Sequence, residues 1–124
     1  MSWWVYLKDE QDNLCSVPPF IEGGTTYGEV DTTGKIIPSP NSVAEINVTY
    51  NYAIHFGDLG SDGLRSLNGL RAKYAIDTLQ KVIQKLNTDR SDDYWEPTEG
   101  NARHTLEILL KWAQLCPDAI FSIS

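Results

Sequence analysis

The residues best suited to chemistry gather in one acidic aromatic tract, residues 92–101, which reads Asp-Asp-Tyr-Trp-Glu-Pro-Thr-Glu-Gly-Asn. His104 stands three residues after it, and a carboxylate beside an imidazole can act as a general acid–base pair. Asp92 and Asp93 are adjacent, so on extended backbone their side chains point to opposite sides and both are not expected to serve one site. A hydrolase that uses Asp93 and His104 is therefore one hypothesis.

The remaining chemistry-bearing residues form no recognised catalytic or metal-binding motif. Cys15 and Cys116 stand in no activating motif, and Gly23-Gly24-Thr25-Thr26 lacks the lysine and the spacing of a phosphate-binding loop. His55 is the only other histidine, and no His-x-Glu or Cys-x-x-Cys spacing occurs, so we expect neither a metal nor a cofactor. Both thiols are expected to be reduced and buried. A non-enzymatic function is favoured over the hydrolase.

The tract also suits binding, because tyrosine and tryptophan give large contact areas at low entropic cost while amides fix orientation. The predicted ligand- or partner-binding residues are Asp92, Asp93, Tyr94, Trp95, Thr98, Asn101, His104, Asn47, Thr49 and Asn51, with Tyr27 on a glycine-rich ribbon. Two plainer interpretations stay open. One is that the Trp95 ring fills the core between the helices. The other is that the polar ladder of Asn47, Thr49 and Asn51 is the solvated side of a sheet.

The end of the tract carries the signals of a helix start. Thr98 and Asn101 are competing N-caps after Pro97. Free N–H groups at such an end attract anions, and Gly100 permits close backbone approach. Four nearby acids repel a phosphate and stabilise the helix end themselves, so simple capping is favoured over an anion site.

Hydrophobic periodicity predicts two amphipathic helices on either side of the tract. The first begins at Ala72 and ends near Asn87, a residue that tolerates a left-handed cap. The second begins after Pro97 and ends before Pro117, which cannot extend it. Together they hold the tract between them.

Alternation of apolar and polar residues predicts the strands. The clear ones are residues 3–7, 43–52 and 118–123, and residues 14–17 are expected to return as a hairpin partner of the first. Residues 23–41 are expected to form a flexible loop or ribbon, since they are rich in Gly, Thr, Ser and Pro. We therefore predict a single α+β domain over residues 1–124, a small mostly antiparallel sheet with both helices packed on one face.

Composition narrows the class of partner. The chain has 124 residues with 10 Lys+Arg against 17 Asp+Glu and a formal net charge of -7, which argues against direct binding to nucleic acid. An acidic surface can instead steer toward a basic protein patch, including one that normally holds nucleic acid, although solubility is the plainer interpretation. No apolar run is long enough to span a membrane, and no secretion signal is evident, so we expect a cytosolic protein without membrane contact.

Motifs over nearly the whole chain carry a resemblance. They are Trp3 or Trp4 with Val5-Tyr6-Leu7, Glu22-Gly23-Gly24-Thr25, Asn47-Val48-Thr49-Tyr50-Asn51-Tyr52, Asp92-Asp93-Tyr94-Trp95, Thr98 with Gly100-Asn101-Ala102, and Trp112-Ala113 leading to Pro117-Asp118-Ala119 and Phe121. In these motifs the chain resembles a group of small uncharacterised proteins encoded by phages and prophage-bearing bacteria, a group with no assigned activity. The resemblance implies a host-cell cytosol as the setting. Residues 27–42 are longer and less glycine-rich than that group's pattern.

Three functions follow as hypotheses. The leading one is a non-enzymatic accessory binding protein, a counter-defence inhibitor that binds a host protein with a basic, nucleic-acid-binding surface. The first alternative is a module for a nucleotide-like ligand stacked on Tyr94 or Trp95 and bonded by Asn101. The second alternative is the hydrolase. Homodimerisation through an exposed edge strand near either terminus is also predicted.

Overall fold

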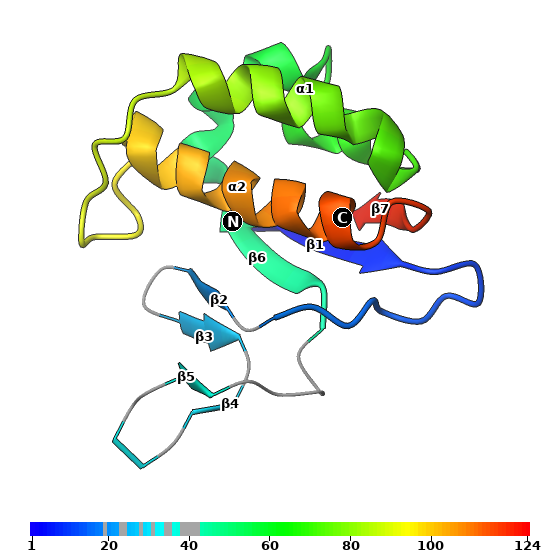
Figure 1. The fold of residues 1–124 in the computed structure, drawn as a ribbon. Helices are drawn as coiled ribbons and strands as arrows, with labels where there is room; N and C mark the ends of the chain where they lie inside the picture. Colours follow the sequence, from blue (N-terminus) through cyan, green and yellow to red (C-terminus); the bar gives the residue numbers. More distant parts are fainter. Residues whose placement is uncertain (19, 23–24, 28, 31, 34–35, 38–42) are drawn as a thin grey trace.

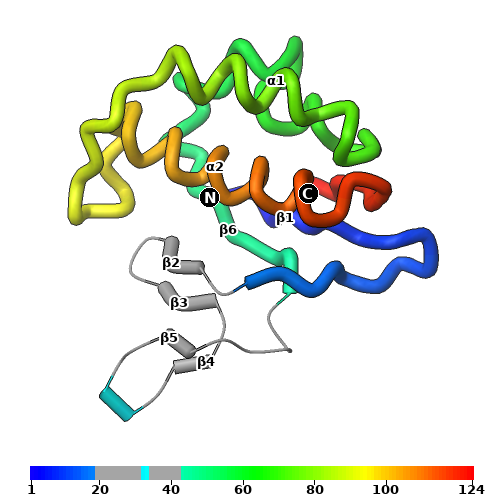
Figure 2. Tube along the Cα trace, in the orientation of Figure 1, coloured from blue at the N-terminus to red at the C-terminus, as the bar shows by residue number. Residues whose placement is uncertain are grey.

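The computed structural model describes residues 1–18, 20–22, 25–27, 29–30, 32–33, 36–37 and 43–124 (Figure 2). Its main strands are β1 (Ser2–Lys8), β6 (Glu45–Thr49) and β7 (Ile120–Ile123). Its helices are α1 (Ala72–Lys85) and α2 (Glu99–Leu115), and three short 3-10 helices, η1 (Tyr50–His55), η2 (Gly57–Leu59) and η3 (Gly63–Leu67), lie between β6 and α1. Both long helices lie on the same side of the three-stranded sheet (Figure 1). The predicted α+β fold is confirmed.

The sheet is antiparallel, in the order β6-β1-β7, with β1 at its centre. Val5 faces Ile46 on one side and Ile123 on the other, and all three side chains are buried under the helices. Trp4 belongs to the opposite face and keeps 40% of its surface exposed. This alternation between faces follows from the period of two along a strand.

Strand β6 is shorter than predicted because a cap stops it. The hydroxyl of Thr49 accepts the N–H of Asn51 at 3.2 Å, which is the N-cap bond of η1, and the backbone turns there. The prediction of one strand from Val43 to Tyr52 is therefore wrong at its end. Tyr52 is fully buried, but it reaches the core from η1 and not from the sheet.

The outer edge of β7 is covered by the segment that precedes α1. Phe121 donates to the carbonyl of Leu70 and accepts from the N–H of Gly69, and the Asn68 side chain accepts the N–H of Ile123. β7 therefore presents no open row of N–H and C=O groups over these residues. Because β1 lies at the centre of the sheet, the edge pairing predicted for a homodimer has no free strand near either terminus among the described residues.

Both helices bury the predicted apolar faces. α1 has no side-chain cap; its first N–H groups, at Ala72 and Lys73, donate to the carbonyls of Ala119 and Pro117. α2 begins with Thr98 as its N-cap, which resolves the competition with Asn101. The left-handed cap predicted near Asn87 is wrong, since α1 ends at Lys85, its C-cap Leu86 has a φ of -92°, and Asn87 is not among the described residues with a positive φ.

Two other predicted segments differ. Residues 14–17 form only isolated bridges, Lys8 with Leu14 and Ser16 with Val43, and no strand. The described parts of residues 20–37 contain two hairpin-like sheets, β2 (Phe20–Glu22) with β3 (Thr25–Tyr27), and β4 (Glu29–Val30) with β5 (Ile36–Ile37). The ribbon was predicted over residues 23–41, and those of its residues that belong to neither sheet nor to 32–33 lie outside the described residues. The side chain of Tyr27 also lies outside the description.

Candidate functional site

The connector, residues 86–98, joins α1 to α2 and folds back over the first turn of α2 (Figure 1). Asn101 holds it from within α2. Its side-chain oxygen accepts the N–H of Ser91 at 3.0 Å, and its side-chain nitrogen donates to the carbonyls of Asp93 and Glu96 at 3.1 and 2.9 Å. Asn101 is only 4% exposed, so these bonds form away from water. The amide predicted to bind a ligand instead binds its own chain.

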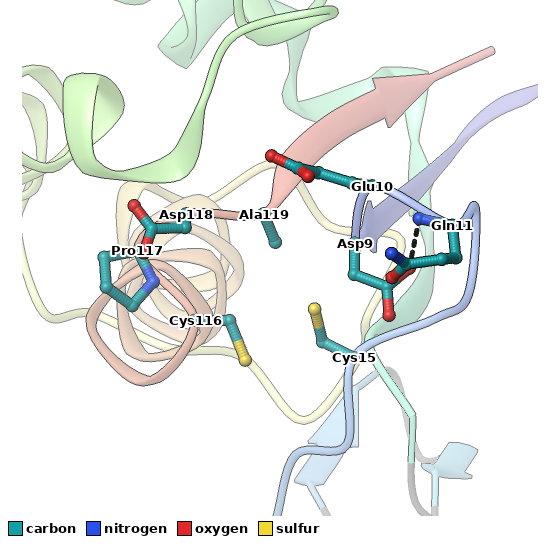
Figure 3. A pocket seen from close by; sticks show the side chains of 8 residues that line it. All are labelled: Asp9, Glu10, Gln11, Cys15, Cys116, Pro117, Asp118 and Ala119. Carbon is teal, nitrogen blue, oxygen red and sulfur yellow. Dashed lines mark hydrogen bonds between the residues drawn. The ribbon is translucent and has the colours of Figure 1, made fainter.

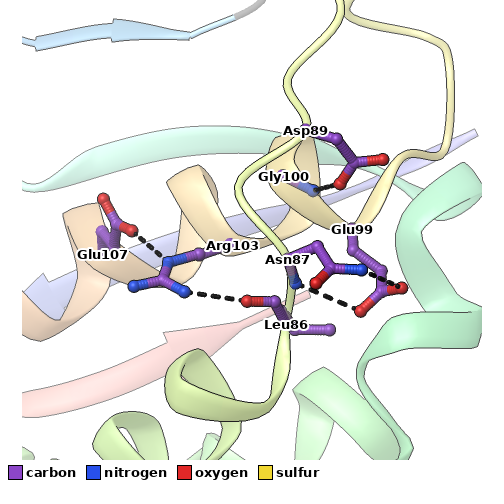
Figure 4. Close-up of polar contacts among 7 residues, drawn as sticks. All are labelled: Leu86, Asn87, Asp89, Glu99, Gly100, Arg103 and Glu107. Atoms are coloured by element: carbon purple, nitrogen blue, oxygen red, sulfur yellow. Dashed lines mark hydrogen bonds and ion pairs between the residues drawn. The ribbon is translucent and has the colours of Figure 1, made fainter.

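The connector crosses the helix at Gly100. The side chain of Asp89 accepts the N–H of Gly100 at 3.2 Å (Figure 4). The Thr98 hydroxyl accepts the N–H of Asn101 at 3.0 Å. An added Cβ at Gly100 would lie 2.5 Å from the carbonyl carbon of Asp89 and 2.6 Å from the nitrogen of Arg90. Internal oxygens thus use these helix-start N–H groups, which confirms capping over an anion site.

A second set of contacts clasps the end of α1 to α2. Arg103 donates to the carbonyl of Leu86 at 2.8 Å and to the Glu107 carboxylate at 2.8 Å (Figure 4). Glu99 accepts both the backbone and the side-chain N–H of Asn87, at 3.2 and 3.3 Å. The two residues that follow α1 are therefore bonded to side chains from the first two turns of α2.

Tyr94 docks the connector on the outer edge of β6. Its hydroxyl accepts the N–H of Thr49 at 2.9 Å and donates to the carbonyl of Asn47 at 3.2 Å. The ring packs edge-on against Tyr52, with centroids 5.5 Å apart, and the Tyr52 hydroxyl donates to the carbonyl of Tyr94. One phenol thus satisfies the unpaired groups of an edge strand.

The 3-10 helix η1 fixes the other side of the connector. Asn51 donates from its side chain to the carbonyl of Trp95 at 2.9 Å, and a ring nitrogen of His55 lies 2.8 Å from the carbonyl of Pro97. Both bonds join backbone of the connector to a separate element. The main chain on either side of Glu96 is therefore held in place.

Trp95 is the exception in this network, because its indole points outward. The side chain is 57% exposed, whereas its backbone N–H donates to the Asp93 carboxylate at 3.0 Å. Its ring contacts the ring of Tyr94, with centroids 5.1 Å apart and planes at 70°. The interpretation that Trp95 fills the core is wrong. Tyr94 takes the inner position instead.

The structure sorts the predicted binding residues into two groups. Asp92 and Trp95 are exposed, as is the side of Asp93 not used for the Trp95 N–H. The remaining residues named for the polar ladder do not face a common ligand. Thr49 is 1% exposed and caps η1, and the Asn47 side chain donates to the Ser2 hydroxyl at 2.8 Å.

His104 lies partly buried on α2, three residues after Asn101. One oxygen of the Asp93 carboxylate bonds the Trp95 N–H, so that carboxylate has a structural role in the turn. The catalytic pairing of Asp93 with His104 remains a prediction. Within the described part of the chain, the structure has no group of three or more His, Cys, Asp or Glu residues placed to hold a metal.

Sequence reasoning missed the residues that receive the connector. Arg103, Tyr52 and His55 came from segments interpreted only as helix, strand or linker. Gly100 carried the one usable signal, because a glycine in the first turn of a helix marks close approach of another backbone. It did not reveal which backbone approaches.

A separate pocket of about 400 Å³ lies at the other end of α2 and contains both cysteines (Figure 3). It is lined by Asp9, Glu10, Gln11, Cys15, Cys116, Pro117, Asp118 and Ala119. Trp95, Asn101 and His104 do not line it, so the predicted site and this pocket are distinct. The cysteines are only partly buried, which corrects the expectation of buried thiols.

Burial, followed by the interaction with the Cys116 thiol and the charges of Cys116 and Asp9, together raise the pKa of the Cys15 thiol to about 12. Cys15 is therefore a protonated thiol at neutral pH. Both cysteines line this pocket, and both are partly exposed.

No protein-family model matches this chain, and neither the curated proteins nor the solved structures contain a significantly similar one. Among the described residues, no helix is both long and apolar enough to cross a membrane. The site is therefore argued from its own geometry.

Proposed function

We propose that this protein is a non-enzymatic binding protein whose contact surface is centred on Trp95. The observation that carries the proposal is the contrast between an exposed indole and the fixed backbone beneath it. The side chain is 57% exposed, yet its own N–H and carbonyl are bonded to Asp93 and Asn51. An aromatic side chain held in one place before binding loses little entropy on association. Such residues commonly dominate the energy of an interface.

Ile54 extends the proposed surface. It is 76% exposed and lies one 3-10 turn after Asn51, the residue that bonds the Trp95 carbonyl. Positions three apart in a 3-10 helix lie on the same side, which places Ile54 next to the connector. Two large apolar side chains on neighbouring elements are a plausible centre for a protein interface.

The charge around Trp95 favours a basic partner. Asp92, Asp93 and Glu96 are exposed beside it, and the chain carries a formal charge of -7. Acidic groups at the rim of an interface accelerate encounter with a basic surface and reject an acidic one. With the resemblance to phage-encoded proteins, this supports the proposal of a counter-defence inhibitor of a host protein that normally holds nucleic acid. The nucleotide-like ligand has less support, because the Asn101 amide is bonded internally.

A photo-crosslinking amino acid placed at Trp95 tests the proposal in host cells. The matched control places it at Tyr74, another aromatic side chain that is 66% exposed but lies on α1. We expect one basic host protein to be crosslinked from position 95 and not from position 74. That protein is then purified and its affinity is measured against the wild type and Trp95→Ala.

Trp95→Ala should weaken binding by roughly 30-fold or more, as a central aromatic residue of an interface does, with unchanged circular dichroism. Asp92→Asn with Glu96→Gln should weaken it mainly at low salt, because both changes remove charge but keep side-chain shape. Equal crosslinking from positions 74 and 95, or equal affinity of Trp95→Ala and wild type, would refute the proposed surface.

A further inference from the structure

Cys15 and Cys116 line the same pocket although they come from opposite ends of the chain. Each is held in place by hydrogen bonds of its backbone. Cys15 donates from its N–H to the carbonyl of Leu7 at 3.0 Å, and its own carbonyl accepts from Ala44 at 2.9 Å. Cys116 ends α2, with its N–H donating to the carbonyl of Trp112 at 2.8 Å. The two cysteines are thus placed at one pocket by the fold and not by a flexible tail.

The thiols share a pocket that small molecules can enter. Figure 3 shows both side chains directed into the same space. Interaction with Cys116 is also one of the causes that raise the pKa of the Cys15 thiol. The pocket measures about 400 Å³ and both residues are partly exposed. This volume lies within the range of small-molecule sites, so a compact reagent can approach both sulfurs.

We propose that Cys15 and Cys116 are a thiol pair that exchanges with low-molecular-weight disulfides to form an internal disulfide. The product would link the segment after β1 to the end of α2. This inference is independent of the binding surface at Trp95, which lies at the other end of α2 and uses none of the pocket residues.

The exchange takes two displacements. The Cys116 thiol loses its proton to solvent, and its sulfur attacks one sulfur of the reagent, whose S–S bond breaks and releases one small thiol. Cys15 then loses its proton, its sulfur attacks the Cys116 sulfur of the mixed disulfide, and the second small thiol leaves. Two cysteine thiols are oxidised and one reagent disulfide is reduced to two thiols. The order follows from the raised pKa of Cys15, which keeps that thiol protonated at neutral pH.

Charge around the pocket selects the reagent. Asp9, Glu10 and Asp118 line it, and the two nearby cations, Arg71 and Lys73, are paired with Glu10 at 3.9 Å and Asp118 at 3.4 Å. Three acids against two bases leave the rim negative. A cationic disulfide such as cystamine is therefore expected to react faster than an anionic one such as dithiodiglycolate.

The test treats the reduced full chain with cystamine under native conditions and follows the intact mass and the peptide map. We expect the loss of two hydrogens and a linked peptide pair that contains Cys15 and Cys116. Cys15→Ser should stop at a mixed disulfide on Cys116, and Cys116→Ser should react slowly. Dithiodiglycolate should react at least about tenfold more slowly at low salt, with the difference shrinking as salt rises.

Two results would overturn the proposal. One is a wild-type product that carries a separate cystamine adduct on each cysteine, since that would show that the sulfurs cannot reach each other. The other is an internal disulfide that forms only after urea is added. The wild-type measurement needs no variant to fold, so a failure of either serine variant leaves the test intact.

Discussion

Gly100 is a residue at which two stretches of backbone come close together, and it makes the connector possible. A methyl group there would fall 2.5 to 2.7 Å from backbone atoms of Asp89 and Arg90, which cannot rotate away as a side chain would. Gly100→Ala should therefore lower the free energy of unfolding by about 2 kcal/mol, because the clash exceeds the gain in helix propensity. Urea unfolding measures this. Gly57→Ala is the control, since nothing lies within 4 Å of its added Cβ, and an equal effect of both changes would contradict the close crossing.

Because of Cys15, the free energy of unfolding should depend on pH in the alkaline range. Its folded pKa of about 12 lies above the reference value of 9.0, so between these values the unfolded chain loses a proton that the folded chain keeps. Stability is then fully present below pH 9 and falls as pH rises toward 12. The urea midpoint of the wild type should fall more steeply over this window than that of Cys15→Ser. Parallel curves for the two proteins would mean that Cys15 does not contribute.

Strand β6 shows how one side chain can complete an element. The Tyr94 hydroxyl bonds the N–H of Thr49 and the carbonyl of Asn47 at 2.9 and 3.2 Å. Tyr94→Phe keeps the ring against Tyr52 but leaves both backbone groups without that partner, at a cost of about 1–2 kcal/mol. The exposed Tyr74→Phe is the matched control and should change stability by less than about 0.5 kcal/mol. Thermal unfolding of both variants decides, and equal melting temperatures would contradict the bridging role.

The helices and main strands could be predicted because their apolar residues repeat at the periods of the two structures. The ends of elements could not, since they depend on partners far along the chain. The start of α1 is satisfied by the carbonyls of Pro117 and Ala119, and β6 stops where Thr49 begins to cap η1. A period of two continues through Tyr52 in the sequence, and only the cap reveals the change of structure.

Across the whole molecule, the predicted binding residues have two different roles: some hold the connector in place and others are exposed to solvent. Asn101 and Tyr94 were selected as candidate contacts because they are polar and aromatic, and those same properties let them fasten the connector to α2 and to β6. The sequence left two positions open for the Trp95 ring, the core and the surface, because an indole is found in both. Residue type therefore located the important segment, but it did not distinguish the residues that hold the connector in place from the residue that is exposed for binding.

The pocket that holds both cysteines is likewise a property of the whole molecule. Nothing in the sequence places Cys15 beside Cys116, since the segments that carry them are brought together by β1, α2 and the bridges near Val43. A link between them would tie the front of the sheet to the end of α2. The connector fixes the opposite end of that helix, so the link would leave α2 held at both of its ends.

Amide hydrogen exchange across the connector tests most directly whether it is a rigid platform for Trp95. The N–H of Ser91 is bonded to the side chain of Asn101, and the N–H groups of Trp95 and Glu96 are bonded to Asp93. In the wild type these three N–H groups should therefore exchange roughly 100-fold or more slowly than in a free peptide. In Asn101→Ala that protection should disappear at Ser91 and Glu96 while the amides of β1 stay protected. Free-peptide rates at these positions in the wild type, or unchanged rates in Asn101→Ala, would contradict the rigid platform.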